Sequence, residues 1–157
     1  MTQSQEIPIT AEGLEDVRRQ LDELVRVRRP EIVAKIKAAR EHGDLSENFE
    51  YHAARNEQSF LESKILELEA IVKNHVLIES HAPAGVVDLL SRVTFEEDGE
   101  GPETYSIVGT TEADPAAGKI SFESAIGRAL IGHRVGDEVQ VRTPSGSTYS
   151  VRILKVE

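Results

Sequence analysis

The sequence contains no cysteine and no tryptophan, and it has only four Phe and three Tyr among its 157 residues. Without cysteine the chain can form neither disulfides nor thiolate metal sites, and it offers no thiol nucleophile. This fits a reducing compartment, so we expect a cytoplasmic protein. So few aromatic side chains leave little material for an aromatic ligand pocket or for a surface on which bases stack.

The chain also lacks an excess of basic residues, since 18 Lys and Arg face 28 Asp and Glu, a net charge of -10. This charge opposes unaided binding to a nucleic-acid backbone or to an anionic membrane surface. No apolar run approaches the ~18 residues that cross a bilayer, and the first residues do not follow the pattern of a signal peptide. We therefore expect a soluble protein with no membrane partner.

Residues 1–79 carry apolar side chains at helical spacing, interrupted near Gly43. Thr10 suits an N-cap, and Pro30 is expected to bend the first helix without breaking it. The short connection near 42–47 predicts an antiparallel coiled-coil hairpin about 45 Å long. The expected seam is Leu14, Val17, Leu21, Leu24, Ile32, Val33 and Ile36 in the first helix, and Phe49, Ala53, Phe60, Leu61, Ile65, Leu68, Ile71 and Val72 in the second.

Residues 80–157 change to strand-like patterns after a linker at 79–85. One short helix is expected within 124–132. The class is therefore α+β: a helical hairpin followed by a second domain, a small antiparallel sheet with one helix packed on it. The expected strands are Val86–Phe95, Thr104–Val108, Lys119–Phe122, Glu138–Arg142 and Tyr149–Val156.

The hairpin tip concentrates four carboxylates: Glu41, Asp44, Glu47 and Glu50. Asp44 and Glu47 have the spacing of an acidic capping box, in which both side chains bond the first amides of the second helix. The same spacing would place their Cβ atoms about 5–6 Å apart, so both could address one hydrated Mg²⁺ or one attacking water. The residues alone leave both interpretations open.

Two exposed carboxylates are too few for a useful Mg²⁺ site, because Mg²⁺ normally needs further oxygen ligands such as substrate phosphates. A self-contained nuclease is therefore disfavoured. A narrow rod with an acidic end could instead reach into a channel of a partner and complete a metal site there.

Three segments resemble the bacterial transcript cleavage factors of the Gre family: AREHGDLSEN at 39–48, EYHAAR at 50–55 and SAIGRALIG at 124–132. The similarity extends over nearly the whole chain. It implies a coiled-coil hairpin over 1–79 and an FKBP-like domain over 80–157 that docks on RNA polymerase. It further implies a monomer that enters the secondary channel of the polymerase, where the nascent RNA 3′ end is extruded in a backtracked complex.

The resemblance also implies residue roles. Asp44 would help to hold a Mg²⁺ shared with the polymerase, and Glu47 would position or deprotonate the attacking water. Arg40 and Arg55 match basic positions that contact the extruded RNA. The segment formed by Ser124, Ala125 and Ile126 matches the polymerase-docking loop, although Ala125 stands where the family commonly has Pro.

Two other functions stay open at this point. Ser46, at a position that is frequently basic in the family, makes the tip more acidic, as in inhibitory paralogues that block the channel without stimulating cleavage. A prolyl isomerase would place the function in the FKBP-like domain. It is disfavoured because a proline pocket needs convergent aromatic side chains, and this half offers only Phe95, Phe122, Tyr105 and Tyr149.

Overall fold

The computed structural model describes residues 5–43 and 48–157, which form two compact units. One unit is Leu14–Asn74, and the other combines the residues up to Gly13 with His75–Glu157. Each unit is described separately below. The domain boundary between residues 79 and 80 stays a prediction from the sequence.

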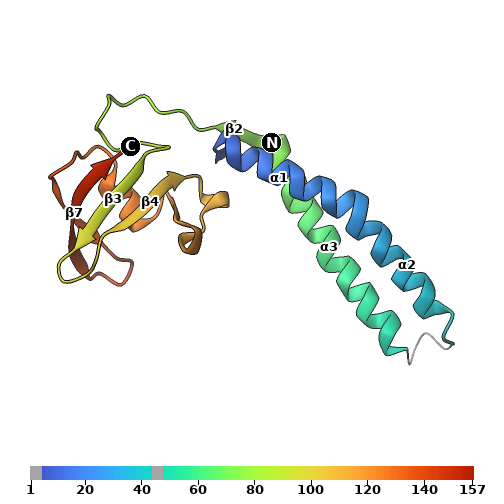
Figure 1. Cartoon of the computed structure of the whole chain (residues 1–157). Coiled ribbons are helices and arrows are strands. Elements are labelled where there is room, and N and C mark those ends of the chain that lie inside the picture. The colour runs from blue at the N-terminus through green and yellow to red at the C-terminus, as the bar shows by residue number, and fades with distance from the viewer. Residues whose placement is uncertain (1–4, 44–47) are drawn as a thin grey trace. The chain divides into compact units, whose positions relative to one another are not determined.

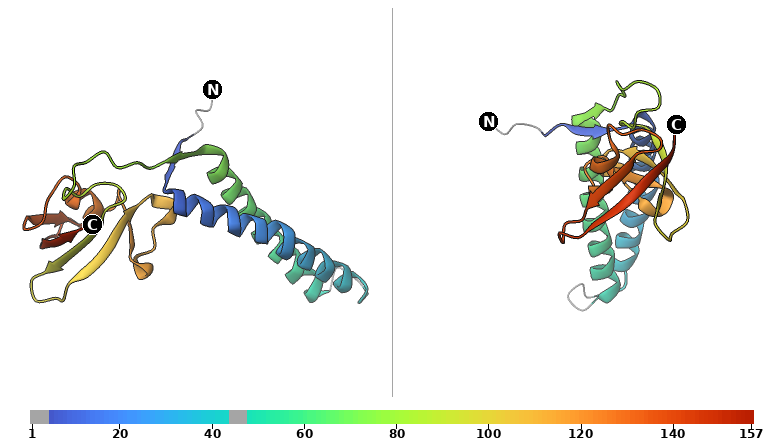
Figure 2. Two further views of the ribbon diagram at one scale, coloured as in Figure 1. Left: turned by 45° about the horizontal axis from the view of Figure 1, so that its top comes forward. Right: turned by 90° about the vertical axis from the view of Figure 1, so that its left-hand side faces the viewer.

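The helical unit is a hairpin (Figure 1) built from α1 (Ala11–Glu23), a π-helical segment (Leu24–Arg28), α2 (Arg29–Arg40) and α3 (Phe49–Asn74). Figure 2 shows α2 and α3 side by side in both of its views. Two ion pairs tie these helices together, Arg29 with Glu62 and Lys35 with Glu57, each at 2.9 Å. Residue numbers rise along α2 while they fall along α3, so the helices are antiparallel, as predicted.

The buried seam of the hairpin is narrower than the sequence pattern suggests. Phe49 and Phe60 were expected in it, but they are 88% and 78% exposed, and Val33 and Ala53 are exposed as well. Successive helical positions are about 100° apart, so Phe60 points away from the seam when its neighbour Leu61 faces it. The buried side chains of α2 and α3 are Ile36, Ala39, Ala54, Leu61, Ile65, Leu68 and Ile71.

Pro30 does not break the first helix, as predicted from the pattern that resumes after it. A proline ring would clash with the carbonyl four residues earlier in a regular α-helix. The π-helical segment directly before α2 changes this register, and the Arg29 N–H donates to the Leu24 carbonyl. The helix then continues to Arg40.

Within the described residues, no helix combines the length and the apolar character needed to cross a membrane.

The second unit contains a five-stranded sheet in the order β5-β4-β3-β7-β6. Its elements are β3 (Arg92–Glu97), β4 (Glu103–Val108), β5 (Lys119–Ser121), α4 (Ala125–Leu130), β6 (Glu138–Arg142) and β7 (Thr148–Val156). The α+β class and the single α-helix in this half are confirmed. The buried core consists of Val87, Val93, Phe95, Ile107, Ile120, Leu130, Val139, Val141, Val151 and Ile153.

Two details of the sheet differ from the prediction. The sheet is mixed, because β5 pairs with β4 in parallel after two 3₁₀ turns, Thr110–Glu112 and Pro115–Ala117, carry the chain back. The strand expected from Val86 begins only at Arg92. The chain turns before it at Leu90, whose φ of 72° is incompatible with an extended strand.

A short parallel pair of strands, β1 (Ile7–Ile9) and β2 (His75–Leu77), was not predicted. The predicted N-cap at Thr10 is confirmed, since its hydroxyl accepts from the Gly13 N–H at 3.0 Å. The Glu112 carboxylate in turn accepts from the Thr10 N–H at 2.6 Å and from the Thr10 hydroxyl. Glu112 therefore links the N-terminal segment to the 3₁₀ turn after β4.

The expected linker at 79–85 has no helix or strand, yet it is anchored. One carboxylate oxygen of Asp88 accepts from the Ser80 hydroxyl at 3.2 Å and from the backbone N–H groups of His81 and Ala82 at 3.0 and 3.1 Å. Partial burial raises the pKa of Asp88, but hydrogen bonds from the Leu89 backbone N–H and from these three groups outweigh burial, so that the pKa of Asp88 lies below the ordinary value.

Candidate functional site

The predicted catalytic pair, Asp44 and Glu47, lies outside the described residues. The chain on both sides of the pair is described, and Asn48 connects the two sides. Its side-chain N–H donates to the Ala39 carbonyl in the last turn of α2 at 2.6 Å, and its side-chain oxygen accepts from the Tyr51 N–H at 3.1 Å. Asn48 thus caps α3 and ties the start of this helix to the last turn of α2.

Asn48 was not predicted to have a role of its own, although it stands directly before the second helix, where Asn is a favoured N-cap. An N-cap side chain accepts a hydrogen bond from the backbone N–H two or three residues after it. Asn48 does so, since its side-chain oxygen accepts from the N–H of Tyr51, three residues later. A second contact spans the same end, since His42 lies 3.9 Å from Glu50, an ion pair when the imidazole is protonated.

Replacing Asn48 by Ala is expected to destabilise the hairpin by about 1–2 kcal/mol, because a cap and a bond to the Ala39 carbonyl are both lost. Asn48→Asp is the matched control: it keeps the oxygen that accepts from Tyr51 but loses the donor. Hydrogen exchange of the first turn of α3 would measure the effect. Equal protection in Asn48→Ala and the unmodified chain would contradict the capping role.

The predicted RNA-contacting residues border one side of the hairpin end. Arg40 ends α2, and its guanidinium lies 5.8 Å from the centre of the Tyr51 ring. Arg55 follows Tyr51 by one helical turn, so both share a face of α3. Both arginines are exposed, and Arg55 donates to Gln58 at 2.9 Å. The Tyr51 ring lies against Arg40 and shares a helix face with Arg55, a placement that was not predicted from the sequence.

The described residues do not form a metal site by themselves, because no group of three His, Asp or Glu among them is placed to hold an ion. The proposed donors at the tip are carboxylates, which are the oxygen ligands that Mg²⁺ prefers. The donor type therefore fits Mg²⁺, while the number of donors requires a partner to supply the rest.

The predicted docking segment lies at the start of α4. Ser124 caps this helix: its hydroxyl accepts from the Gly127 N–H at 3.1 Å and donates to the Ser121 carbonyl at 2.6 Å. Ala125 and Ile126 are partly buried and pack against the core. A Cβ on Gly127 would lie 2.2 Å from the Ser121 carbonyl oxygen, so glycine is required where α4 meets β5.

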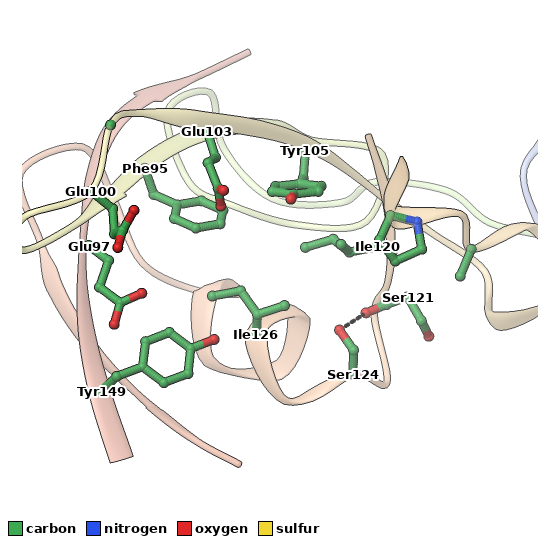
Figure 3. Close-up of a pocket in the computed structure, with 13 residues that line it drawn as sticks. Phe95, Glu97, Glu100, Glu103, Tyr105, Ile120, Ser121, Ser124, Ile126 and Tyr149 are labelled. Carbon is green, nitrogen blue, oxygen red and sulfur yellow. Dashed lines mark hydrogen bonds between the residues drawn. The ribbon is translucent and has the colours of Figure 1, made fainter. Parts of the chain in front are cut away.

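A pocket of about 470 Å³ lies beside this segment (Figure 3). Ser124 and Ile126 line it, together with the aromatic side chains of Phe95, Tyr105 and Tyr149. The fold therefore brings together aromatic residues that are far apart in the sequence. Their low number was the reason for disfavouring a prolyl isomerase in this half, yet three of the four aromatic residues line one pocket because tertiary packing gathers them.

Comparison with known proteins covers both parts of the chain. Residues 7–76 match the family described as "Transcription elongation factor, N-terminal", and residues 82–157 match "Transcription elongation factor, GreA/GreB, C-term". A crystal structure of the GreA factor homolog 1 (Gfh1) protein of Thermus thermophilus is 30% identical, covers 98% of this chain and 99% of its own, and superposes with a TM-score of 0.44.

Curated relatives match at full length. Transcription elongation factor GreA of Leuconostoc citreum is 49% identical over 159 residues, which cover 100% of this chain and 99% of the relative. The GreA of Thermomicrobium roseum is 51% identical over 153 residues, which cover 96% of this chain and 97% of the relative. With both family matches and these relatives, the chain belongs to the GreA/GreB family of transcription elongation factors.

Proposed function

We propose that this chain is a cytoplasmic transcription elongation factor that enters the secondary channel of RNA polymerase as a monomer and stimulates cleavage of the nascent RNA 3′ end. It is not itself an enzyme, because the polymerase carries out the hydrolysis. The GreA relatives at full length support the general function. Beyond this general function, we propose a mechanism in which the chain donates carboxylates to the active centre of the polymerase.

The observation that carries the proposal is the closed end of the hairpin. The 26 residues of α3 extend about 39 Å, long enough to reach into a deep channel. Asn48 bonds the end of α2 to the start of α3, which ties together the two helix ends that precede and follow residues 44–47 in the chain. The Tyr51 amide already has Asn48 as its acceptor, which supports a role for Asp44 other than capping.

In this proposal, Asp44 contributes one carboxylate to the Mg²⁺ ligands of the polymerase. When bound, Mg²⁺ supplies activation of a water molecule and stabilisation of the leaving oxygen. Glu47 orients the attacking water and accepts its proton, since a carboxylate within hydrogen-bonding reach can act as a general base. The net charge of -10 suits a factor that meets RNA only where another protein confines the strand.

Arg40 and Arg55 are proposed to contact phosphates of the extruded RNA. Replacing either arginine by Ala should lower RNA cleavage at low salt. Cleavage by the variant should also change less with salt concentration, because a complex with one phosphate contact fewer releases fewer counterions when it forms. Arg26→Ala is the matched control: it is an exposed hairpin arginine whose ion pair with Asp22 lies far from the tip in sequence. Unchanged crosslinking to RNA 3′ ends in both variants would contradict the contact.

Cleavage in a reconstituted backtracked complex tests the function directly. Added chain should shorten the transcript and release a 3′ RNA fragment in the presence of Mg²⁺. A channel-blocking inhibitor, the alternative, would slow RNA synthesis in the same assay without releasing RNA. Release of RNA by the unmodified chain therefore decides between a stimulator and an inhibitor.

We further propose that Ser124, Ala125 and Ile126 dock on the polymerase. An Ile126→Ala variant should then bind polymerase more weakly than the unmodified chain.

A further inference from the structure

The sheet of the second unit ends at β6, which pairs only with β7 in the part of the chain that the structure describes. In an antiparallel pair, successive residues alternate between bonding the neighbouring strand and pointing their backbone groups away from it. Directly after β6, the Thr143 N–H donates to the Ser147 carbonyl at 2.8 Å, so the odd-numbered residues of this stretch bond β7. The backbone N–H and C=O groups of Glu138, Gln140 and Arg142 therefore point out of the sheet edge.

The side chains along this edge carry opposite charges at its two ends. Glu138 and Arg142 are exposed with Gln140 between them, whereas the two intervening valines are buried on the core face. Neither charged side chain forms an ion pair within the described residues, although Arg152 of β7 stands opposite Glu138. Proteins commonly protect an edge strand with Pro, Lys or a β-bulge, and β6 has none of these.

A second copy of β6 matches this edge when the two strands run antiparallel with Gln140 opposite Gln140. Glu138 of each copy then stands opposite Arg142 of the other copy, so two pairs of opposite charge form. The same register places all three outward-pointing residues at hydrogen-bonded positions, where each exchanges its N–H and C=O with the residue across from it. A parallel register would instead bring Glu138 close to Glu138 and Arg142 close to Arg142.

We infer that two copies of this chain associate through their β6 strands, which joins the two sheets into one. The partner is assigned to a second copy because the charge pattern of the edge is complementary to itself. A strand of uniform charge would meet a like charge at one end. Each copy contributes one short strand, so the association is weak and reversible, and the monomer that enters the polymerase channel forms on dilution.

A groove of about 520 Å³ along this edge shows what the pairing covers. Gln140 and Arg142 line the groove from β6, and Ala125 and Ala129 line it from α4. The small alanine side chains leave room beside the edge for a second strand. Ala125 also belongs to the proposed docking segment, so pairing with a second copy and docking on polymerase exclude each other. This consequence rests on the proposed function, whereas the self-association does not.

Translational diffusion of the full chain, measured by NMR over a range of concentrations, tests the association. The unmodified chain should form dimers as its concentration rises toward about 1 mM. Gln140→Pro should stay monomeric, because proline lacks the outward N–H yet costs β6 no hydrogen bond to β7. Thermal unfolding verifies that this variant is folded. An unmodified chain that is monomeric throughout, or a folded Gln140→Pro variant that still forms dimers, would overturn the inference.

Charge reversal tests the register without altering the backbone. Glu138→Arg and Arg142→Glu each set like charges opposite each other in the dimer, so each should weaken association about 10-fold. An equimolar mixture of the two variants should associate again, because the arginines of one chain then face the glutamates of the other. The control Arg92→Glu reverses an exposed charge on β3, which has a strand on both sides, and should leave the dimer unchanged. A mixture that stays as weak as its components would refute the proposed pairing.

The competition with docking has a test of its own, because the chain contains no cysteine. Gln140→Cys sets the only thiols of the two copies opposite each other, at a Cα separation of about 5.5 Å that a disulfide can span. The oxidised dimer should bind polymerase at least about 10-fold more weakly than the reduced chain, and reduction should restore binding. Equal binding of both forms would refute the competition. A failure of the unmodified chain to stimulate cleavage would count against the proposed function alone.

Discussion

Asp44→Asn and Glu47→Gln are each expected to abolish stimulated transcript cleavage while binding to RNA polymerase is nearly unchanged. Both substitutions keep the size of the side chain but remove the negative charge that a Mg²⁺ ligand or a general base requires. The expected loss is ~100-fold or more, at the upper end of what is lost when a supporting residue of a metal site is removed. RNA release from a backtracked complex and polymerase affinity, measured on the same samples, check this result.

The hairpin end supplies matched controls, since Glu41 and Glu50 are exposed carboxylates on either side of the pair. Glu41→Gln and Glu50→Gln change the tip charge by the same amount and should keep most of the cleavage activity. If all four variants lost activity equally, bulk acidity would explain the function. Full cleavage by the double variant Asp44→Asn, Glu47→Gln would rule out donated carboxylates altogether.

Leu130→Ala is expected to have the largest effect on stability, a loss of about 2–5 kcal/mol. Leu130 is completely buried at the end of α4, within the core of the sheet unit. Truncation removes apolar contacts and leaves a cavity in the buried core, and both effects lower the free energy of unfolding. Urea unfolding should show a lower midpoint with little change in slope.

Arg128→Ala provides the comparison, because Arg128 is exposed on the same helix. Its effect on unfolding should stay within about 0.5 kcal/mol, as for ordinary surface positions. Because α4 carries Ser124 and Ile126 to the pocket, Leu130→Ala should also weaken polymerase binding at temperatures where the sheet unit begins to unfold. A loss below about 1 kcal/mol would show that the core around α4 relaxes freely.

Local patterns predicted the elements that depend on neighbours in the sequence. Apolar spacing indicated the helices of the hairpin, Thr10 its first cap, and the resumed pattern after Pro30 its continuity. Alternation located β4 and β6 to within one residue, and Ser124 marked the start of α4. These predictions succeeded because periodicity and capping act within a few residues of the chain.

Periodicity was less reliable where several apolar residues compete for one seam. Phe60 and Leu61 both fit the pattern, but only one of two adjacent positions can face a partner helix, and packing selected Leu61. The π-helical segment before Pro30 and the parallel pairing of β5 were not predicted either. Both depend on how the backbone satisfies its hydrogen bonds in three dimensions.

The helical hairpin, the α+β class and the position of an acidic pair between the two hairpin helices could be predicted from the sequence, because each depends on local spacing and residue type. The contacts of Asn48 at the hairpin end, and the meeting of Phe95, Tyr105 and Tyr149 in one pocket with an acidic end, became visible only in the folded chain. These contacts join residues on separate strands or on both sides of a turn. Composition records how many such residues exist, whereas packing determines which of them come together.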